Sequence, residues 1–203
     1  MATKVSINVY DISGGLASSM SQMILGKKID GIWHTGVIVF GKEYYFGGGI
    51  CTDPIGQTPY GVPVKSEEVG ETEVPEELFQ EFLQDLAQKY TDSNYDLIKN
   101  NCNHFANDCV EFLTGEGLPT YILGLIDEIA SAPMGAMILN MLGGMQEKMQ
   151  GQGHQLFTPE TFGGGNTQVN DQVKDMVNQM QGNQNPPNNQ NPPKDSKPED
   201  DLD

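Results

Sequence analysis

A break in composition near Gly151 limits the part of this chain that can form a hydrophobic core. Residues 151–203 are dominated by Gly, Asn, Gln, Pro and Asp, contain the stretch NQNPPNNQNPPK and end in the acidic KPEDDLD. Such a segment cannot bury enough apolar surface to offset the entropy lost on ordering. We therefore predict one folded domain at 1–150 and a disordered, acidic Asn/Gln/Pro-rich tail at 151–203. The tail is interpreted as a solubilising spacer or as a partner-binding arm.

The charge balance excludes several classes of partner. The chain has 28 acidic residues against 11 cations, all of them lysines, and a net charge of −17. This surface repels phosphate backbones and anionic lipid, and without arginine it lacks bidentate contacts to bases. No apolar stretch of about 18 residues is present to span a membrane. We expect no nucleic-acid partner and no membrane span, and the acidity fits a partner with a basic surface.

Compartment and cofactors follow from the N-terminus and the cysteines. The opening MATKVSINVY has neither the apolar region nor the small-residue cleavage site of a secretory signal. Three cysteines without CxxC spacing argue against a disulfide scaffold and for a reducing compartment. Together with the three histidines they do not form the two short ligand clusters of a structural zinc site. We expect a cytoplasmic protein without metal or cofactor, with the nucleus left open as a second compartment.

Apolar periodicity predicts an α+β domain. Alternating or β-branched segments predict strands at 5–10, 33–40 and 42–48, the last two joined at Gly41-Lys42 as a hairpin. Three glycines break the last strand, and CTDPIGQTPYGVP then predicts a loop. Helical spacing predicts helices at 16–25, 74–90, 101–113, 118–130 and 133–149. The helix at 74–90 should bury a face made of Leu78, Phe79, Phe82, Leu83 and Leu86.

Cys102 lies in KNNCNHF, where the helix at 101–113 begins. The positive end of the helix dipole and the unpaired first-turn N–H groups favour a thiolate there, and the same groups can hold an oxyanion. Spacing with Phe105, Cys109 and Phe112 turns Cys102 towards the sheet. The alternative interpretation is a small buried apolar residue, which is how most free cysteines behave.

His34 is the candidate base for such a nucleophile. It lies in IWHTGVIV, just inside a predicted strand, where a histidine taken alone is more often structural. His104 is only two residues from Cys102 along the helix, so it projects from nearly the opposite side. A helix-start cysteine packed against a strand histidine is typical of thiol proteases, in which imidazole takes the thiol proton and later protonates the leaving group.

Three segments carry a family resemblance: YDIS, LGKKIDGIWHTGVIVFGKEYYFGGGI and NNCNHFANDCVEFLTGEGLP. From about Val5 to Met145 the chain resembles the PPPDE superfamily of papain-like thiol peptidases, and within it the deSUMOylating isopeptidases, or DeSI family. The resemblance implies a permuted papain-like α+β fold, with a small antiparallel sheet packed against helices. It also implies a homodimer and a dyad of Cys102 as nucleophile and His34 as base, without an obligate third residue.

The resemblance further implies that a SUMO-like or ubiquitin-like modifier is removed from a substrate lysine through a thioester. Such a modifier ends in Gly-Gly, so its channel must be narrow. Glycines would let a backbone pass closely, although they equally suit a tight bend. The residues expected beside the channel are Trp33, Gly47, Gly48, Gly49, Asn101 and Asn103. Two features depart from the family pattern: a histidine at position 104, and a tail with no counterpart.

Two other functions stay open. An acyl-protein thioesterase (S-depalmitoylase) would use the same dyad with an apolar tunnel, which the methionine-rich MGAMILNMLGGM could line instead of forming helix core. A non-catalytic adaptor would bind modified proteins through the domain and other partners through the tail. The intact pair of Cys102 and His34 argues against the adaptor.

Overall fold

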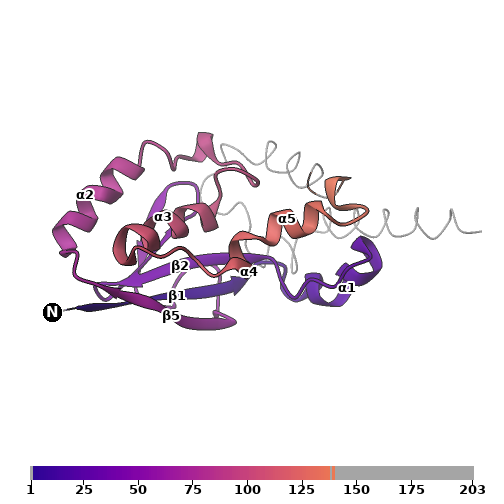
Figure 1. Cartoon of the computed structure of the whole chain (residues 1–203), viewed down its shortest axis with the longest axis horizontal. Helices are drawn as coiled ribbons and strands as arrows, with labels where there is room; N and C mark the ends of the chain where they lie inside the picture. The colour runs from indigo at the N-terminus through magenta and orange to yellow at the C-terminus, as the bar shows by residue number, and fades with distance from the viewer. Residues whose placement is uncertain (1, 138, 140–203) are drawn as a thin grey trace, which may run out of the picture.

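The computed structural model describes residues 2–137 and 139, and it confirms the predicted α+β class. Within these residues, five strands form one antiparallel sheet in the order β4-β3-β2-β1-β5, with helices packed against it (Figure 1). The strands are β1 (Thr3–Asp11), β2 (Trp33–Val39), β3 (Lys42–Phe46), β4 (Ile50–Asp53) and β5 (Lys65–Thr72). The predicted tail at 151–203, and most of the helix predicted at 133–149, lie outside the described residues.

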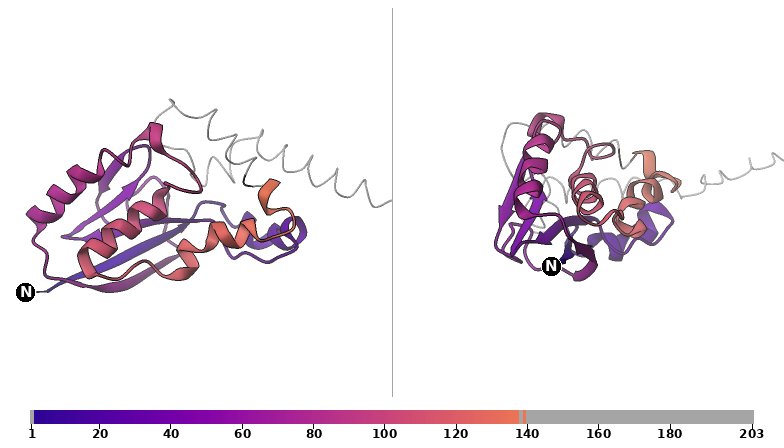
Figure 2. Two further views of the ribbon diagram at one scale, coloured as in Figure 1. Left: turned by 45° about the horizontal axis from the view of Figure 1, so that its top comes forward. Right: turned by 60° about the vertical axis from the view of Figure 1, so that its left-hand side comes forward.

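The main core lies between one face of the sheet and two helices, α2 (Glu76–Leu86) and α3 (Cys102–Thr114) (Figure 2). Side chains alternate along a strand, so Ile7 and Val37 point to this face, where α3 packs against β2 and β3. A second apolar cluster joins α1 (Leu16–Leu25) to α5 (Leu125–Ala130) beyond the end of the sheet. Within the described part of the chain, no helix is both long and apolar enough to cross a membrane.

The hairpin of β2 and β3 is confirmed, but its turn lies one residue earlier than predicted. Phe40 and Gly41 both have positive φ, 51° and 74°, as the two central residues of a tight hairpin turn require. Lys42, predicted as part of the turn, is instead the first residue of β3 and pairs with Val39. A glycine follows Phe40 because this turn type puts both central residues in the left-handed region.

Two strands were not predicted from the sequence. Residues 51–53, predicted as loop, belong to β4 and pair with β3 after the glycine turn at 47–49. Strand β5 has the polar sequence KSEEVGET and pairs with β1 at the edge of the sheet, with a register shift at Val5/Ser6. Its strand conformation comes from backbone hydrogen bonds to β1, because its own side chains show no apolar alternation.

The helices predicted at 16–25, 74–90 and 101–113 are confirmed in type and place, but α2 ends at Leu86, four residues before its predicted end. Helix α1 has the predicted bounds, α2 begins directly after Pro75, and α3 ends at Gly115, which has φ 77°. Leu78 was predicted on the buried face of α2, but it is 47% exposed. The single helix predicted at 118–130 is two short ones, α4 (Thr120–Leu123) and α5, divided at Gly124. A short 3₁₀ helix, η1 (Asp92–Asn94), precedes α3.

The second face of the sheet holds a buried carboxylate. Glu43 in β3 accepts hydrogen bonds from Asn8 Nδ2 at 2.9 Å and from the Tyr10 hydroxyl at 2.7 Å. It also accepts one from the Gly56 N–H at 2.8 Å. Gly56 belongs to the segment 54–64 between β4 and β5, so the carboxylate attaches that segment to the sheet. A buried charge is tolerated when it is bonded in this way.

Gly36 in β2 leaves the space that this carboxylate occupies. A Cβ at position 36 would lie 2.1 Å from Glu43 Oε1. We expect Gly36→Ala to lower the free energy of unfolding by about 1–3 kcal/mol through overpacking. Urea denaturation measures this loss. The matched control is Gly49→Ala, whose Cβ would meet no atom within 4 Å. Equal stability of the two variants would contradict the packing argument.

Candidate active site

The candidate site lies where β3 separates from β2. The ladder between the two strands joins only Val37–Val39 to Lys42–Tyr44. Residues 33–36 of β2 remain next to β1 on their other side, where His34 is paired with Tyr10. The start of α3 lies against the edge of β2 that β3 leaves. The two ends of β2 therefore differ along this edge. Residues 37–39 pair with β3, whereas residues 33–36 lie against the start of α3.

Asn101 begins α3 with a capping box. Its Oδ1 accepts hydrogen bonds from the N–H groups of Asn103 at 2.9 Å and His104 at 3.2 Å. In return, His104 Nδ1 lies 3.3 Å from the Asn101 N–H and accepts from it. This reciprocal arrangement satisfies groups that a helix start otherwise leaves unpaired. His104 thus has a structural partner at the helix start.

Burial holds Cys102 as a neutral thiol. The side chain is 6% exposed, and desolvation raises the pKa of its thiol to about 12. The N–H groups of Thr35, Asn103 and Cys102 itself, together with the Tyr95 hydroxyl, act in the opposite direction. We expected the helix start to favour a thiolate. Its N–H groups do lower the pKa, but desolvation outweighs them.

His34 is buried as a neutral imidazole among tyrosines. It lies on the sheet face of Tyr10 and Glu43, away from α3, and its ring stacks on Tyr60 with centroids 3.5 Å apart. Tyr45 meets it edge-on at 5.8 Å. Desolvation lowers the pKa of His34 to about 3. Within the described residues its Nε2 has no hydrogen-bond partner, so this nitrogen remains available for a proton transfer.

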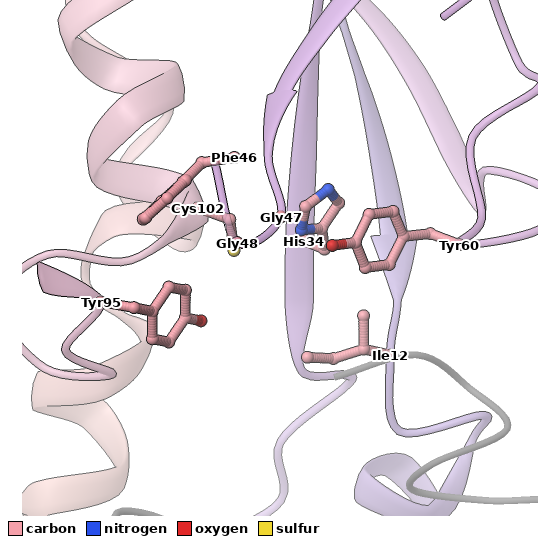
Figure 3. A pocket seen from close by; sticks show the side chains of 8 residues that line it. All are labelled: Ile12, His34, Phe46, Gly47, Gly48, Tyr60, Tyr95 and Cys102. Atoms are coloured by element: carbon pink, nitrogen blue, oxygen red, sulfur yellow. The ribbon is translucent and has the colours of Figure 1, made fainter. Parts of the chain in front are cut away.

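Cys102 and His34 line one pocket, although α3 packs on one face of the sheet and the His34 side chain lies on the other. Figure 3 shows Cys102 on one side of the pocket with Tyr95, and His34 with Tyr60 on the other. The pocket has a volume of about 10 Å³, which is room for about one water molecule. Its lining consists of Ile12, His34, Phe46, Gly47, Gly48, Tyr60, Tyr95 and Cys102.

The predicted channel residues divide into two groups. Gly47 and Gly48 line the pocket of Cys102 and His34. Gly48 has φ 86°, and a Cβ at Gly47 would lie 2.9 Å from the Tyr60 hydroxyl, so both positions suit glycine. Gly49 lies outside the pocket lining and accepts the turn hydrogen bond from the Gly47 N–H at 3.0 Å.

The other three predicted channel residues do not line this pocket. Trp33 packs edge-on against Tyr121, with ring centroids 6.4 Å apart. Asn101 and Asn103 line a second pocket of about 160 Å³, which also contains His104. Of these three, Asn103 alone bonds to both β2 and Cys102: its Nδ2 donates to the Trp33 carbonyl at 2.9 Å, and its Oδ1 lies 3.8 Å from Cys102 Sγ.

Sequence reasoning missed the tyrosines of the site. Tyr60 lies in the segment predicted as loop, and Tyr95 follows η1, so neither belongs to a periodic apolar pattern. Asp11, part of the YDIS segment, was quoted without a role. Its carboxylate accepts hydrogen bonds from Ser13 and from the Ile32 N–H, and so shapes the approach to β2. No local sequence signal identifies these three residues as part of the site.

The arrangement provides a nucleophile, a proton acceptor and hydrogen-bond donors in one desolvated place. A thiol and an imidazole at one pocket can perform acyl transfer when the imidazole accepts the thiol proton. The N–H groups that face Cys102 are suited to stabilise negative charge. Across the described residues, no three His, Cys, Asp or Glu side chains cluster as a metal site would require.

The comparisons with known proteins agree with this chemistry. The PPPDE putative peptidase domain matches residues 3–143. Desumoylating isopeptidase 1 of Homo sapiens is 42% identical over 144 residues, covering 70% of this chain and 86% of that protein. Desumoylating isopeptidase 1 of Xenopus laevis is likewise 42% identical, with 70% and 85% covered. DeSI-like protein sdu1 of Schizosaccharomyces pombe is 32% identical, with 59% and 62% covered.

The burial of neutral His34 makes stability depend on pH. The unfolded imidazole binds a proton below its ordinary pKa of 6.5, whereas the folded one stays neutral down to about pH 3. Protons therefore favour the unfolded chain, and stability falls as the pH drops below 6.5. We expect His34→Gln to reduce this slope by up to about 1.4 kcal/mol per pH unit in chemical denaturation down to about pH 4. Identical slopes in variant and wild type would refute the buried neutral imidazole.

Proposed function

The chain belongs to the PPPDE family of cysteine peptidases, and from this premise we propose that it is an isopeptidase acting through Cys102 and His34. Its substrates are proteins that carry a SUMO-like or ubiquitin-like modifier on a lysine. The observation that carries the proposal is the single pocket lined by Cys102, His34, Gly47 and Gly48. Nucleophile and base meet there beside two glycines that can accept a backbone in close contact.

The first chemical step forms a thioester. His34 takes the proton of the Cys102 thiol, and the sulfur attacks the carbonyl carbon of the modifier's terminal glycine. As the bond to the lysine nitrogen breaks, the imidazolium of His34 returns the proton to that nitrogen, and the lysine leaves as an amine. We assign the N–H groups of Thr35 and Cys102, which face the sulfur, to holding the carbonyl oxygen.

The second step hydrolyses the thioester. His34 takes a proton from a water molecule, whose oxygen attacks the thioester carbonyl. The carbon–sulfur bond breaks, the sulfur regains a proton from the imidazolium, and the modifier leaves with a free carboxyl group, which loses its remaining proton to solvent. The resting pair is neutral on both sides, because burial raises the pKa of Cys102 and lowers that of His34. Proton transfer therefore accompanies the attack instead of preceding it.

Two features bear on the choice of modifier. The human and Xenopus relatives carry the name desumoylating isopeptidase, which favours a SUMO-like modifier over a ubiquitin-like one. The net charge of −17 fits a partner that presents a basic surface, which both classes of modifier can do. We place a SUMO-like modifier first and make the ubiquitin-like one an outcome of the test below.

Assembly and location belong to the same proposal. Family resemblance implies a homodimer, and sedimentation velocity of the full chain would measure its mass. We place the protein in the cytoplasm, with entry into the nucleus as a second location that imaging of the tagged full chain would reveal.

Electrophilic probes test the activity and separate the alternatives. Three probes are compared by intact mass: one with a SUMO-like tail, one with a ubiquitin-like tail and one with a long acyl chain. We expect the SUMO-like probe to label Cys102. His34→Ala should slow labelling by about 10²- to 10⁴-fold because it removes the base. Cys102→Ser should abolish labelling. Labelling of Cys102 by the acyl probe alone would replace the proposal with a thioesterase. No labelling by any probe would favour the adaptor.

The control is a second histidine at the helix start. His104→Gln preserves the capping box, because a Gln side chain at this helix position can also accept from the Asn101 N–H. We expect it to label at the wild-type rate. Loss of labelling in His104→Gln, with His34→Ala unaffected, would assign the base to the other histidine.

A further inference from the structure

The Asn103 side chain bonds both to β2, the strand of His34, and to Cys102. Its Nδ2 donates to the carbonyl oxygen of Trp33 at 2.9 Å, directly before His34. Its Oδ1 lies 3.8 Å from Cys102 Sγ and accepts from the thiol. The side chain is only 7% exposed, so these bonds are made away from bulk solvent.

These bonds replace strand pairing that β3 does not supply. Trp33 and Thr35 are two residues apart, so their backbone groups point to the same edge of β2. On the N-terminal side of Val37, this edge of β2 has no partner in β3. The Trp33 carbonyl is bonded by Asn103, and the Thr35 N–H faces the sulfur of Cys102. The first turn of α3 thus takes the place of a strand along the edge of β2 at Trp33 and Thr35.

We propose that Asn103 is a positioning residue, which fixes Cys102 relative to His34 by bonding the start of α3 to the start of β2. This role adds to the proposed isopeptidase function, and its expected effect on kcat rests on that function. Its burial and its two bonds support this role. A place beside the modifier's channel stays a separate prediction for Asn103.

The two ends of the amide act differently on the thiol. Oδ1 accepts from S–H, an interaction that favours the protonated form, because a thiolate would face an oxygen lone pair. Nδ2 fixes the distance between the two elements and has no direct effect on the proton. Removing the whole amide should therefore lower the pKa of the Cys102 thiol and also displace the thiol relative to His34. A carboxylate at this position should keep the thiol protonated more strongly, because its negative charge opposes a thiolate.

The experiment measures turnover and thiol reactivity in the full-length protein. Turnover of a SUMO-like isopeptide conjugate gives kcat and KM, and iodoacetamide with peptide mapping gives the alkylation rate of each cysteine across pH. We expect Asn103→Ala to lower kcat by about 10- to 100-fold with KM changed by less than about threefold. Asn103→Asp should lower kcat as well. Alkylation of Cys102 should be faster than wild type in Asn103→Ala and slower in Asn103→Asp.

Two controls separate positioning from loss of stability. Asn107→Ala removes a comparable bond on the same helix, where Asn107 Oδ1 accepts from the Leu118 N–H at 2.9 Å, and it should leave kcat near wild type. Cys109, fully buried in α3, reports opening of the helix, and its alkylation should not change in any variant.

Three results would overturn the role of Asn103. These are wild-type kcat in Asn103→Ala, alkylation of Cys102 moving in the same direction in both variants, or alkylation of Cys109 rising together with that of Cys102. An inactive wild type would overturn the isopeptidase proposal instead, and the opposite shifts in Cys102 alkylation would still establish what the amide does.

Discussion

The site depends on the edge of β2 at residues 33–36, whose backbone groups β3 does not pair. Buried backbone groups must be hydrogen bonded, and a longer β3 would have met that requirement with strand pairs. It would also have closed the sheet between His34 on one face and the helix carrying Cys102 on the other. Because β3 ends its pairing at Val37, the helix start bonds the edge instead, through Asn103 and Cys102. The opening that results is the pocket shared by both candidate residues.

This arrangement sets two electrostatic effects against each other at Cys102. The helix start and its N–H groups favour negative charge on the sulfur, whereas burial favours the neutral thiol. Burial prevails, since the pKa of the thiol rises to about 12, and the same cause lowers the pKa of His34 to about 3. A neutral pair resists reaction with small electrophiles in the absence of substrate. The N–H groups then act mainly on charge that develops during the reaction, when they cost no reorganisation.

The parts of this structure that sequence predicts are those with local signals. The bounds of α1, the start of α2 after Pro75 and the place of α3 each follow from apolar spacing or from proline. β5 could not be predicted, because its polar residues become a strand only by pairing with β1. Tyr60 could not be found for the same reason: nothing in PYG says that a loop tyrosine will stack on His34. Cys102 and His34 could be paired from sequence because each has a local signal and the family supplies the order.

The walls of the pocket differ in how firmly they are held. Glu43 attaches the segment 54–64 to the sheet through the Gly56 N–H, and that segment carries Tyr60, which stacks on His34. Gly47 and Gly48 also line the pocket, and they belong to the turn at 47–49, which is bonded from the Gly47 N–H to the Gly49 carbonyl. A pocket with room for about one water must widen to admit a peptide carbonyl. Glycine has the widest backbone freedom, so the turn at 47–49 is the wall able to yield. The imidazole can then stay fixed on Tyr60 while the substrate enters beside it.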